Sequence, residues 1–86
     1  MEDATKNLII ELYPDDVFMF ADGFDDAIIG ICTKTNKIVY SKTKCIEVLC
    51  KDMEEEEAEE YFSYNVDGAY VGELTPIFVD DTMLFE

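Results

Sequence analysis

The chain has 86 residues, with 21 acidic residues, six lysines and neither arginine nor histidine, so its formal net charge is −15. Such a surface repels nucleic acid and anionic membranes, since both are bound through cationic side chains, and it attracts basic protein surfaces. The missing residue types also exclude a histidine base, a histidine metal ligand and a bidentate arginine clamp for phosphate.

The N-terminal third contains two short apolar segments. Residues 8–13 (LIIELY) form either a strand or one helical turn, and Pro14 with the acidic pair after it ends that element. Residues 17–20 (VFMF) are a second candidate strand. The turn that follows contains Gly23, which is free to adopt a positive φ.

A β-hairpin is predicted next. Apolar residues concentrate in residues 27–33 and again in residues 37–41, and the polar segment TKTNK joins the two. Gly30 lies inside the first of these strands, which indicates either a β-bulge or close packing by another element.

A first helix is predicted over about residues 43–52, with Ser41 or Thr43 as its N-cap. Its inner face repeats at helical spacing and consists of Ile46, Leu49, Cys50 and Met53.

A second helix is predicted over about residues 53–70. We expect Asp52 to be its N-cap, with Glu55 completing a capping box. The acidic residues of its first turn interact favourably with the positive end of the helix dipole. The expected buried face is Ala58, Phe62, Val66 and Ala69, and the expected outward face includes Glu56, Glu59 and Glu60. Gly68 or Gly72 ends this helix.

The last predicted strand covers about residues 74–79, and Pro76 places it at a sheet edge or at a strand start. Together the elements predict one α+β domain over residues 1–86. Its small, mostly antiparallel sheet consists of the hairpin at about 27–41 and this last strand, with both helices on one face. The ends, residues 1–7 and 82–86, are expected to be flexible.

The apolar tail at residues 83–85 (MLF) either packs on the sheet or is an exposed anchor. The three cysteines lack the spacing of a zinc or CxxC motif, so we interpret Cys32, Cys45 and Cys50 as reduced thiols that act as small buried hydrophobic residues. The N-terminus has no basic region and no long apolar run, so neither a signal peptide nor a membrane-spanning segment is expected.

The charges are unevenly distributed. Residues 34–51 contain five of the six lysines, whereas residues 52–86 contain twelve acidic residues and no cation. One interpretation is a solvated face that keeps the protein soluble. The other is a surface that imitates nucleic acid, because exposed carboxylates on a helix approach the charge density of duplex DNA, about one charge per 1.7 Å of axis.

Several smaller groups of residues have both a structural and a functional interpretation. Asp22, Asp25 and Asp26 surround Gly23, and they form either a capped turn, which we favour, or a site for Mg²⁺ or Ca²⁺ that lacks the spacing of an EF-hand. Asn65 is expected to be buried and to bind the backbone of the following bend rather than a ligand. Glu73 and Thr75 either cap the connection to the last strand or form a small polar site.

No nucleophile has a base beside it in the sequence, so we expect neither an enzyme nor a cofactor or metal centre.

Three segments resemble a group of small, uncharacterised bacteriophage proteins. They are FDDAIIG at residues 24–30, YSKTKCI at residues 40–46 and EAEEYFSYNVDGAYVGELTPIFV at residues 57–79. The resemblance covers about residues 21–79, most of the chain, and implies a phage source and expression in the host cytoplasm. It implies no particular activity.

The leading functional hypothesis is therefore an acidic phage protein that binds and inhibits a host protein with a basic surface, such as a nucleic-acid-binding enzyme. The residues expected to bind that partner are Glu54, Glu55, Glu56, Glu59, Glu60, Tyr61, Tyr64, Asp67, Tyr70 and Glu73. The tyrosines are included because tyrosine is enriched at interaction hot spots, although they also suit the edge of the core. The alternative is a structural protein that self-associates, for example as a homodimer, through its sheet edge and C-terminal tail.

Overall fold

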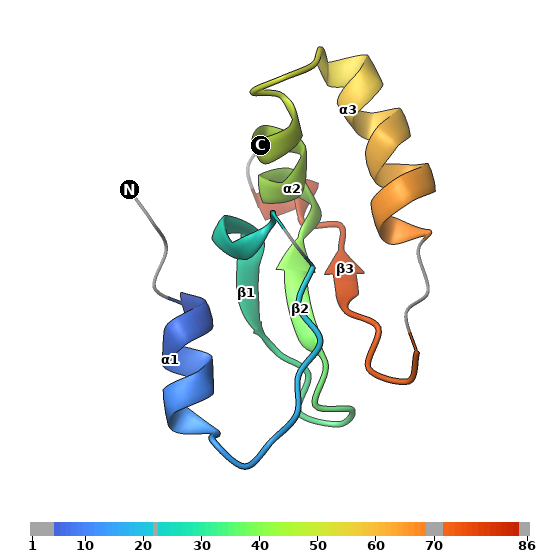
Figure 1. The fold of residues 1–86 in the computed structure, drawn as a ribbon. Coiled ribbons are helices and arrows are strands. Elements are labelled where there is room, and N and C mark those ends of the chain that lie inside the picture. Colours follow the sequence, from blue (N-terminus) through green and yellow to red (C-terminus); the bar gives the residue numbers. More distant parts are fainter. Residues whose placement is uncertain (1–4, 22, 69–71, 85–86) are drawn as a thin grey trace.

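The computed structural model describes residues 5–21, 23–68 and 72–84 (Figure 1). In chain order its helices and strands are α1 (Thr5–Leu12), a 3₁₀ turn η1 (Asp25–Ala27), β1 (Ile28–Ile31), β2 (Ile38–Ser41), α2 (Lys42–Leu49), α3 (Glu55–Tyr61), a π-helical segment η2 (Phe62–Asp67), β3 (Ile77–Val79) and a 3₁₀ turn η3 (Thr82–Leu84). This combination of helices around one small sheet confirms the predicted α+β class.

The sheet has the strand order β1-β2-β3. β1 and β2 are antiparallel and form the predicted hairpin. β3 pairs with β2 in parallel, with Tyr40 opposite Phe78, so the sheet is mixed. A parallel pair needs a long crossover, and α2, α3 and η2 provide it. β3 is an edge strand that begins directly after Pro76, as expected for a residue with no N–H to donate.

The expected irregularity at Gly30 is a β-bulge. Ile28 pairs with Tyr40 and Gly30 pairs with Val39, so Ile29 is an extra residue in β1. A side chain at position 30 would have nothing within 4 Å, which rules out close packing as the reason for this glycine. The bulge leaves the Ile29 side chain exposed on the outer strand of the hairpin.

The two N-terminal apolar segments have different conformations in the structure. Residues 8–13 belong mostly to a helix, α1, which buries Ile9. The candidate strand at residues 17–20 is wrong, because this segment pairs with none of the three strands of the sheet. Its phenylalanines pack on one another instead, with the rings of Phe18 and Phe20 6.2 Å apart. Apolar packing, not a hydrogen-bond ladder, therefore holds this segment.

α2 begins at Lys42 with Ser41 as its N-cap, one of the two expected caps. The Ser41 hydroxyl accepts a hydrogen bond from the Lys44 N–H at 3.1 Å. The helix ends at Leu49, three residues earlier than predicted. Cys50 is exposed just beyond it, so its assignment to the buried face was wrong.

α3 begins at Glu55, and the predicted capping box is wrong. Glu54 occupies the N-cap position, and its side chain makes no capping hydrogen bond. Asp52 lies in the turn that ends α2, where its N–H donates to the Leu49 carbonyl at 3.1 Å. After Tyr61 the helix widens into η2, for which Gly68 is the C-cap. Ala69 lies outside the described residues.

One face of the sheet carries the core. Ile28, Ile38 and Tyr40 project from it into a cluster that also contains Ile9 of α1, Cys45 of α2, and Phe62 and Val66 of η2. The Tyr40 ring stacks on Phe78 with centroids 5.2 Å apart, and Phe62 meets the same Phe78 ring edge-on at 5.5 Å. Side chains of α1, α2 and η2 therefore pack into one core with this face of the sheet.

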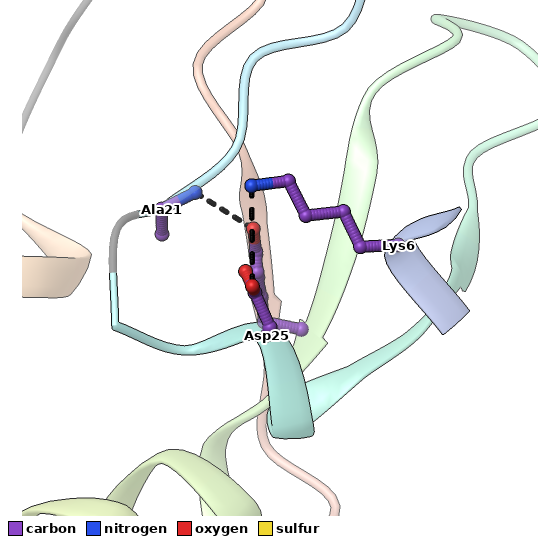
Figure 2. A network of polar contacts seen from close by, with 4 residues as sticks. Lys6, Ala21 and Asp25 are labelled. Carbon is purple, nitrogen blue, oxygen red and sulfur yellow. Dashed lines mark hydrogen bonds and ion pairs between the residues drawn. The ribbon is translucent and has the colours of Figure 1, made fainter. Parts of the chain in front are cut away.

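Tyr40 also fixes the segment before β1. Its side chain is completely buried, and its hydroxyl oxygen accepts a hydrogen bond from the Ala21 N–H at 2.7 Å (Figure 2). Burial, the largest influence, raises the pKa of Tyr40 to about 12. The phenol is therefore a neutral structural group at physiological pH.

The segment after β3 is anchored at the start of α2. The buried Asp81 carboxylate accepts hydrogen bonds from the Ser41 hydroxyl at 2.5 Å and from the Thr43 N–H at 3.1 Å. Burial disfavours the charged carboxylate, but the hydrogen bonds from Ser41 and Thr43 outweigh it and hold the pKa of Asp81 below its ordinary value. Asp81 thus acts as a second cap for α2, supplied from the other end of the chain.

Candidate functional site

The first turns of α3 carry a dense row of carboxylates. Ala58 lies on the buried side of the helix with no exposed surface, and Phe62 and Val66 continue that side at intervals of four residues. All six glutamates between positions 54 and 60 are exposed. This confirms the outward orientation predicted for Glu56, Glu59 and Glu60.

The charge of this row per length of helix axis is close to that of duplex DNA. An α-helix rises about 1.5 Å per residue, so six charges occupy roughly 9 Å of helix axis, compared with about one charge per 1.7 Å of duplex. The negative charge of Glu55, Glu56 and Glu57 lies in the first turn, where the helix dipole partly offsets its self-repulsion.

The carboxylates of α3 have no cationic partner among the described residues. Among the described residues, the ion pair lies away from α3 and joins Lys6 of α1 to Asp25 of η1, with Nζ and Oδ2 3.9 Å apart (Figure 2). Lys6 also lies over the Phe20 ring, with Nζ 5.0 Å from its centroid. The charge of α3 is therefore not neutralised by the described side chains and is directed at solvent.

Two of the expected tyrosines lie on this helix and its π-helical extension. Tyr61 is 44% exposed and Tyr64 is 81% exposed, so neither is a core residue. Asp67 and Glu73 are also exposed, and Tyr70 lies outside the described residues.

An acidic hollow brings several of these groups together. It has a volume of about 330 Å³ and is lined by Met53, Glu57, Glu60, Tyr61, Tyr64 and Asn65. Of the described residues predicted to bind a partner, Glu60, Tyr61 and Tyr64 line it. Glu55 and Glu59 line a different hollow, between α2 and α3, with Thr43, Ile46, Glu47, Cys50 and Thr82.

Asn65 was expected to be buried, and this was wrong. Its side chain is exposed and contributes to the acidic hollow. The hollow also contains Glu57 and Met53, which are absent from the predicted set of partner-binding residues. The sequence did contain a signal for this grouping, because Glu60 and Tyr61 follow Glu57 by three and four residues, and such residues are neighbours on a helix surface.

An apolar groove adjoins the acidic hollow. It has a volume of about 290 Å³, and Tyr61 and Asn65 belong to the lining of both. Its walls come from three segments that are distant in sequence. They are residues 19–24 with Met19, Phe20, Ala21 and Phe24, the α3–η2 helix with Tyr61, Asn65 and Val66, and the β3 segment with Thr75, Pro76 and Phe78.

Of the two candidate polar residues before β3, Thr75 has a structural role. Thr75 donates a hydrogen bond from its hydroxyl to the Gly72 carbonyl at 2.6 Å, which closes the turn before β3. Gly72 and Gly23 both have the positive φ that favours glycine, +118° and +89°. Glu73 is exposed and lines none of the three hollows described above.

The acidic turn near Gly23 holds an ion pair. Asp25 faces Lys6, and Asp22 lies outside the described residues. Within the described parts of the chain, no group of three acidic, cysteine or histidine side chains is placed to hold a metal ion.

The cysteines have three different environments. Cys45 is buried, as expected, and burial raises its pKa to about 12. Cys32 is half-buried, and its pKa is lowered first by a hydrogen bond from the Thr35 side chain and then by the backbone N–H groups of Lys34 and Thr35. Cys50 is exposed.

No protein-family model, curated protein or solved structure matches this chain. None of the helices in the described residues is long and apolar enough to cross a membrane.

Proposed function

We propose that this protein is a phage-encoded binding protein that inhibits a host protein by presenting carboxylates to its basic surface in the host cytoplasm. The observation that carries the proposal is the row of six exposed glutamates formed by α3 and its N-cap Glu54, which have no cationic partner among the described residues. Their charge per length of helix axis supports imitation of nucleic acid, so the favoured target is a nucleic-acid-binding enzyme.

The proposed role is binding, not catalysis. The chain has no histidine or arginine, and the buried Tyr40 and Cys45 hold their protons to a pKa of about 12. The exposed side chains of α3 and η2 are mainly carboxylates and tyrosines, which suits a protein interface that is fast to associate and sensitive to salt.

The test compares two variants with equal loss of charge. Glu56→Gln, Glu59→Gln and Glu60→Gln together neutralise three carboxylates of α3. Glu11→Gln, Asp15→Asn and Asp16→Asn neutralise three exposed carboxylates elsewhere.

Each tagged protein is incubated with host lysate at about 50 mM and about 200 mM salt. Captured proteins are identified by mass spectrometry and tested for competition with DNA. We expect a DNA-binding protein that is retained at low salt, is lost at high salt and is not captured by the α3 variant. Equal capture by the α3 variant and the wild type would contradict the proposal, as would equal losses in both variants.

A second candidate function is self-assembly, and the exposed C-terminal side chains favour it. Met83 and Leu84 of η3 are 65% and 77% exposed, and both β1 and β3 are edge strands. This candidate predicts a dimer or larger species that becomes monomeric when residues 82–86 are deleted. Light scattering coupled to size-exclusion chromatography measures it, and an unchanged mass after deletion would count against it.

A further inference from the structure

We infer that the apolar groove and the acidic hollow together form a docking site for a basic peptide segment that carries a bulky apolar side chain. The inference rests on the proposed function, since it specifies which part of a basic partner is recognised. It depends on two compartments of opposite character that share the wall formed by Tyr61 and Asn65.

The apolar compartment suits one anchoring side chain. Its volume of about 290 Å³ is at the low end of the range for ligand pockets. Phe20, Phe24 and Phe78 contribute aromatic surface, and Pro76 adds a rigid apolar wall. Phe78 is held by ring contacts with Tyr40 and Phe62, so this wall is preorganised. A buried anchor in such a pocket is the usual form of an interaction hot spot.

The acidic compartment specifies the flanking charge. Glu57 and Glu60 line it together with the exposed rings of Tyr61 and Tyr64. Two carboxylates attract a lysine or arginine, and a tyrosine face adds a cation–π contact. The wider charge distribution agrees, because residues 52–86 contain no cation that would compete for the site.

The shared wall joins the two compartments into one site. Tyr61 and Asn65 are four residues apart, at the junction where α3 passes into η2. The Tyr61 ring can contact the anchor on one side and the cation on the other, and the exposed Asn65 amide can hydrogen-bond to the peptide backbone. The preferred ligand is therefore an apolar residue with lysine or arginine close by in the chain, not a uniformly charged polymer.

Three labelled peptides test this preference by fluorescence anisotropy with the full chain at low salt. They are acetyl-Lys-Lys-Phe-Lys-Lys-amide, the same peptide with Ala in place of Phe, and the Phe peptide with Glu in place of every Lys. We expect the basic Phe peptide to bind at least about tenfold more tightly than the basic Ala peptide. The acidic Phe peptide should not bind.

Matched tyrosine variants locate the effect. Tyr61→Ala removes the aromatic part of the shared wall and should reduce the Phe/Ala preference to less than about threefold, since the anchor loses a contact face. Tyr64→Ala alters only the acidic hollow and should weaken both basic peptides while leaving their ratio unchanged. Circular dichroism verifies that both variants fold.

Methionine methyl signals of the wild-type protein give a measurement that needs no variant. Met19 lines the apolar groove, Met53 lines the acidic hollow and Met83 lines neither. We expect the Phe peptide to shift the signals of Met19 and Met53, the Ala peptide to shift Met53 only, and neither peptide to shift Met83.

The outcomes separate this inference from the proposed function. Equal affinities for the basic Phe and Ala peptides, or identical Met19 shifts with both, would overturn the docking site and leave the acidic binding function standing. Failure of both basic peptides to bind would contradict the docking site and would also remove support for recognition of a basic partner.

Discussion

Replacing Asp81 with asparagine should destabilise the fold far more than its place near the C-terminus suggests. The buried carboxylate accepts two hydrogen bonds, from the Ser41 hydroxyl and the Thr43 N–H, at the N-terminus of α2. Asn keeps the shape and one acceptor oxygen, but it loses the charge and leaves one donor poorly satisfied. A lost hydrogen bond to a charged group and a lost helix-dipole interaction together cost about 2 kcal/mol.

That loss is large enough to measure by thermal unfolding. For a domain of this size, about 1 kcal/mol shifts the melting temperature by roughly 4–8 °C, so Asp81→Asn should lower it by about 8–16 °C. Asp80→Asn is the matched control, because Asp80 is exposed and its carboxylate accepts hydrogen bonds from Thr82 in the same turn. Equal melting temperatures for the Asp81→Asn and Asp80→Asn variants would refute the assignment of a long-range cap.

The pH dependence of the same variant has a defined sign. The folded-state pKa of Asp81 is lowered, so its contribution to stability is fully present above the unfolded pKa of about 3.9 and is lost as the pH falls through the folded value. The stability gap between wild type and Asp81→Asn should be constant from pH 5 to 8 and shrink below about pH 4. A gap that widens on acidification would contradict the reasoning.

Three further predictions follow from charge, backbone and thiol environments. Raising the salt concentration from about 20 to about 500 mM should increase the melting temperature, because screening relieves the self-repulsion of a chain with a net charge of −15; a fall would contradict this. Gly23→Ala should destabilise by about 1 kcal/mol because its φ is +89°, whereas Gly30→Ala has open space and no positive φ and should be neutral or slightly stabilising in urea unfolding. In a native thiol titration at pH 8, Cys50 and Cys32 should react and Cys45 only after unfolding, because burial raises its pKa to about 12; three fast thiols would refute this.

Local patterns were sufficient for the features that depend on neighbouring residues. The hairpin was predictable because two short apolar runs flank a polar turn, and Gly30 within the first run indicated a bulge as one of two possibilities. The outward glutamates of α3 followed from helical spacing around Ala58. Residues 8–13 were ambiguous because six mostly apolar residues fit one face of a helix as well as a strand.

Long-range features lay beyond such patterns. Nothing local determines that β3 runs parallel to β2, since strand direction depends on how the crossover helices pack. The Asp52–Glu55 pair fits a capping box, yet the turn that ends α2 uses the Asp52 N–H and leaves Glu54 at the N-cap. The cap from Asp81 joins residues 40 positions apart in sequence. The apolar groove likewise combines three separate segments, so among its described lining residues Tyr61 alone was predicted to bind a partner, while Asn65 and Thr75 were considered only as separate small sites.

Added salt should change self-association and binding of a basic partner in opposite directions, because the negative charge of the protein opposes the first and favours the second. Folding and self-association both bring carboxylates closer together, so screening should favour them. Binding of a basic partner brings opposite charges together, so screening should weaken it. Within the proposed docking site, the contribution of the apolar anchor in the groove lined by Phe20, Phe24 and Phe78 should persist in salt while the contribution of Glu57 and Glu60 fades. The Phe/Ala preference should therefore remain after overall affinity has fallen, whereas affinity from the carboxylate row alone would fall without any such preference.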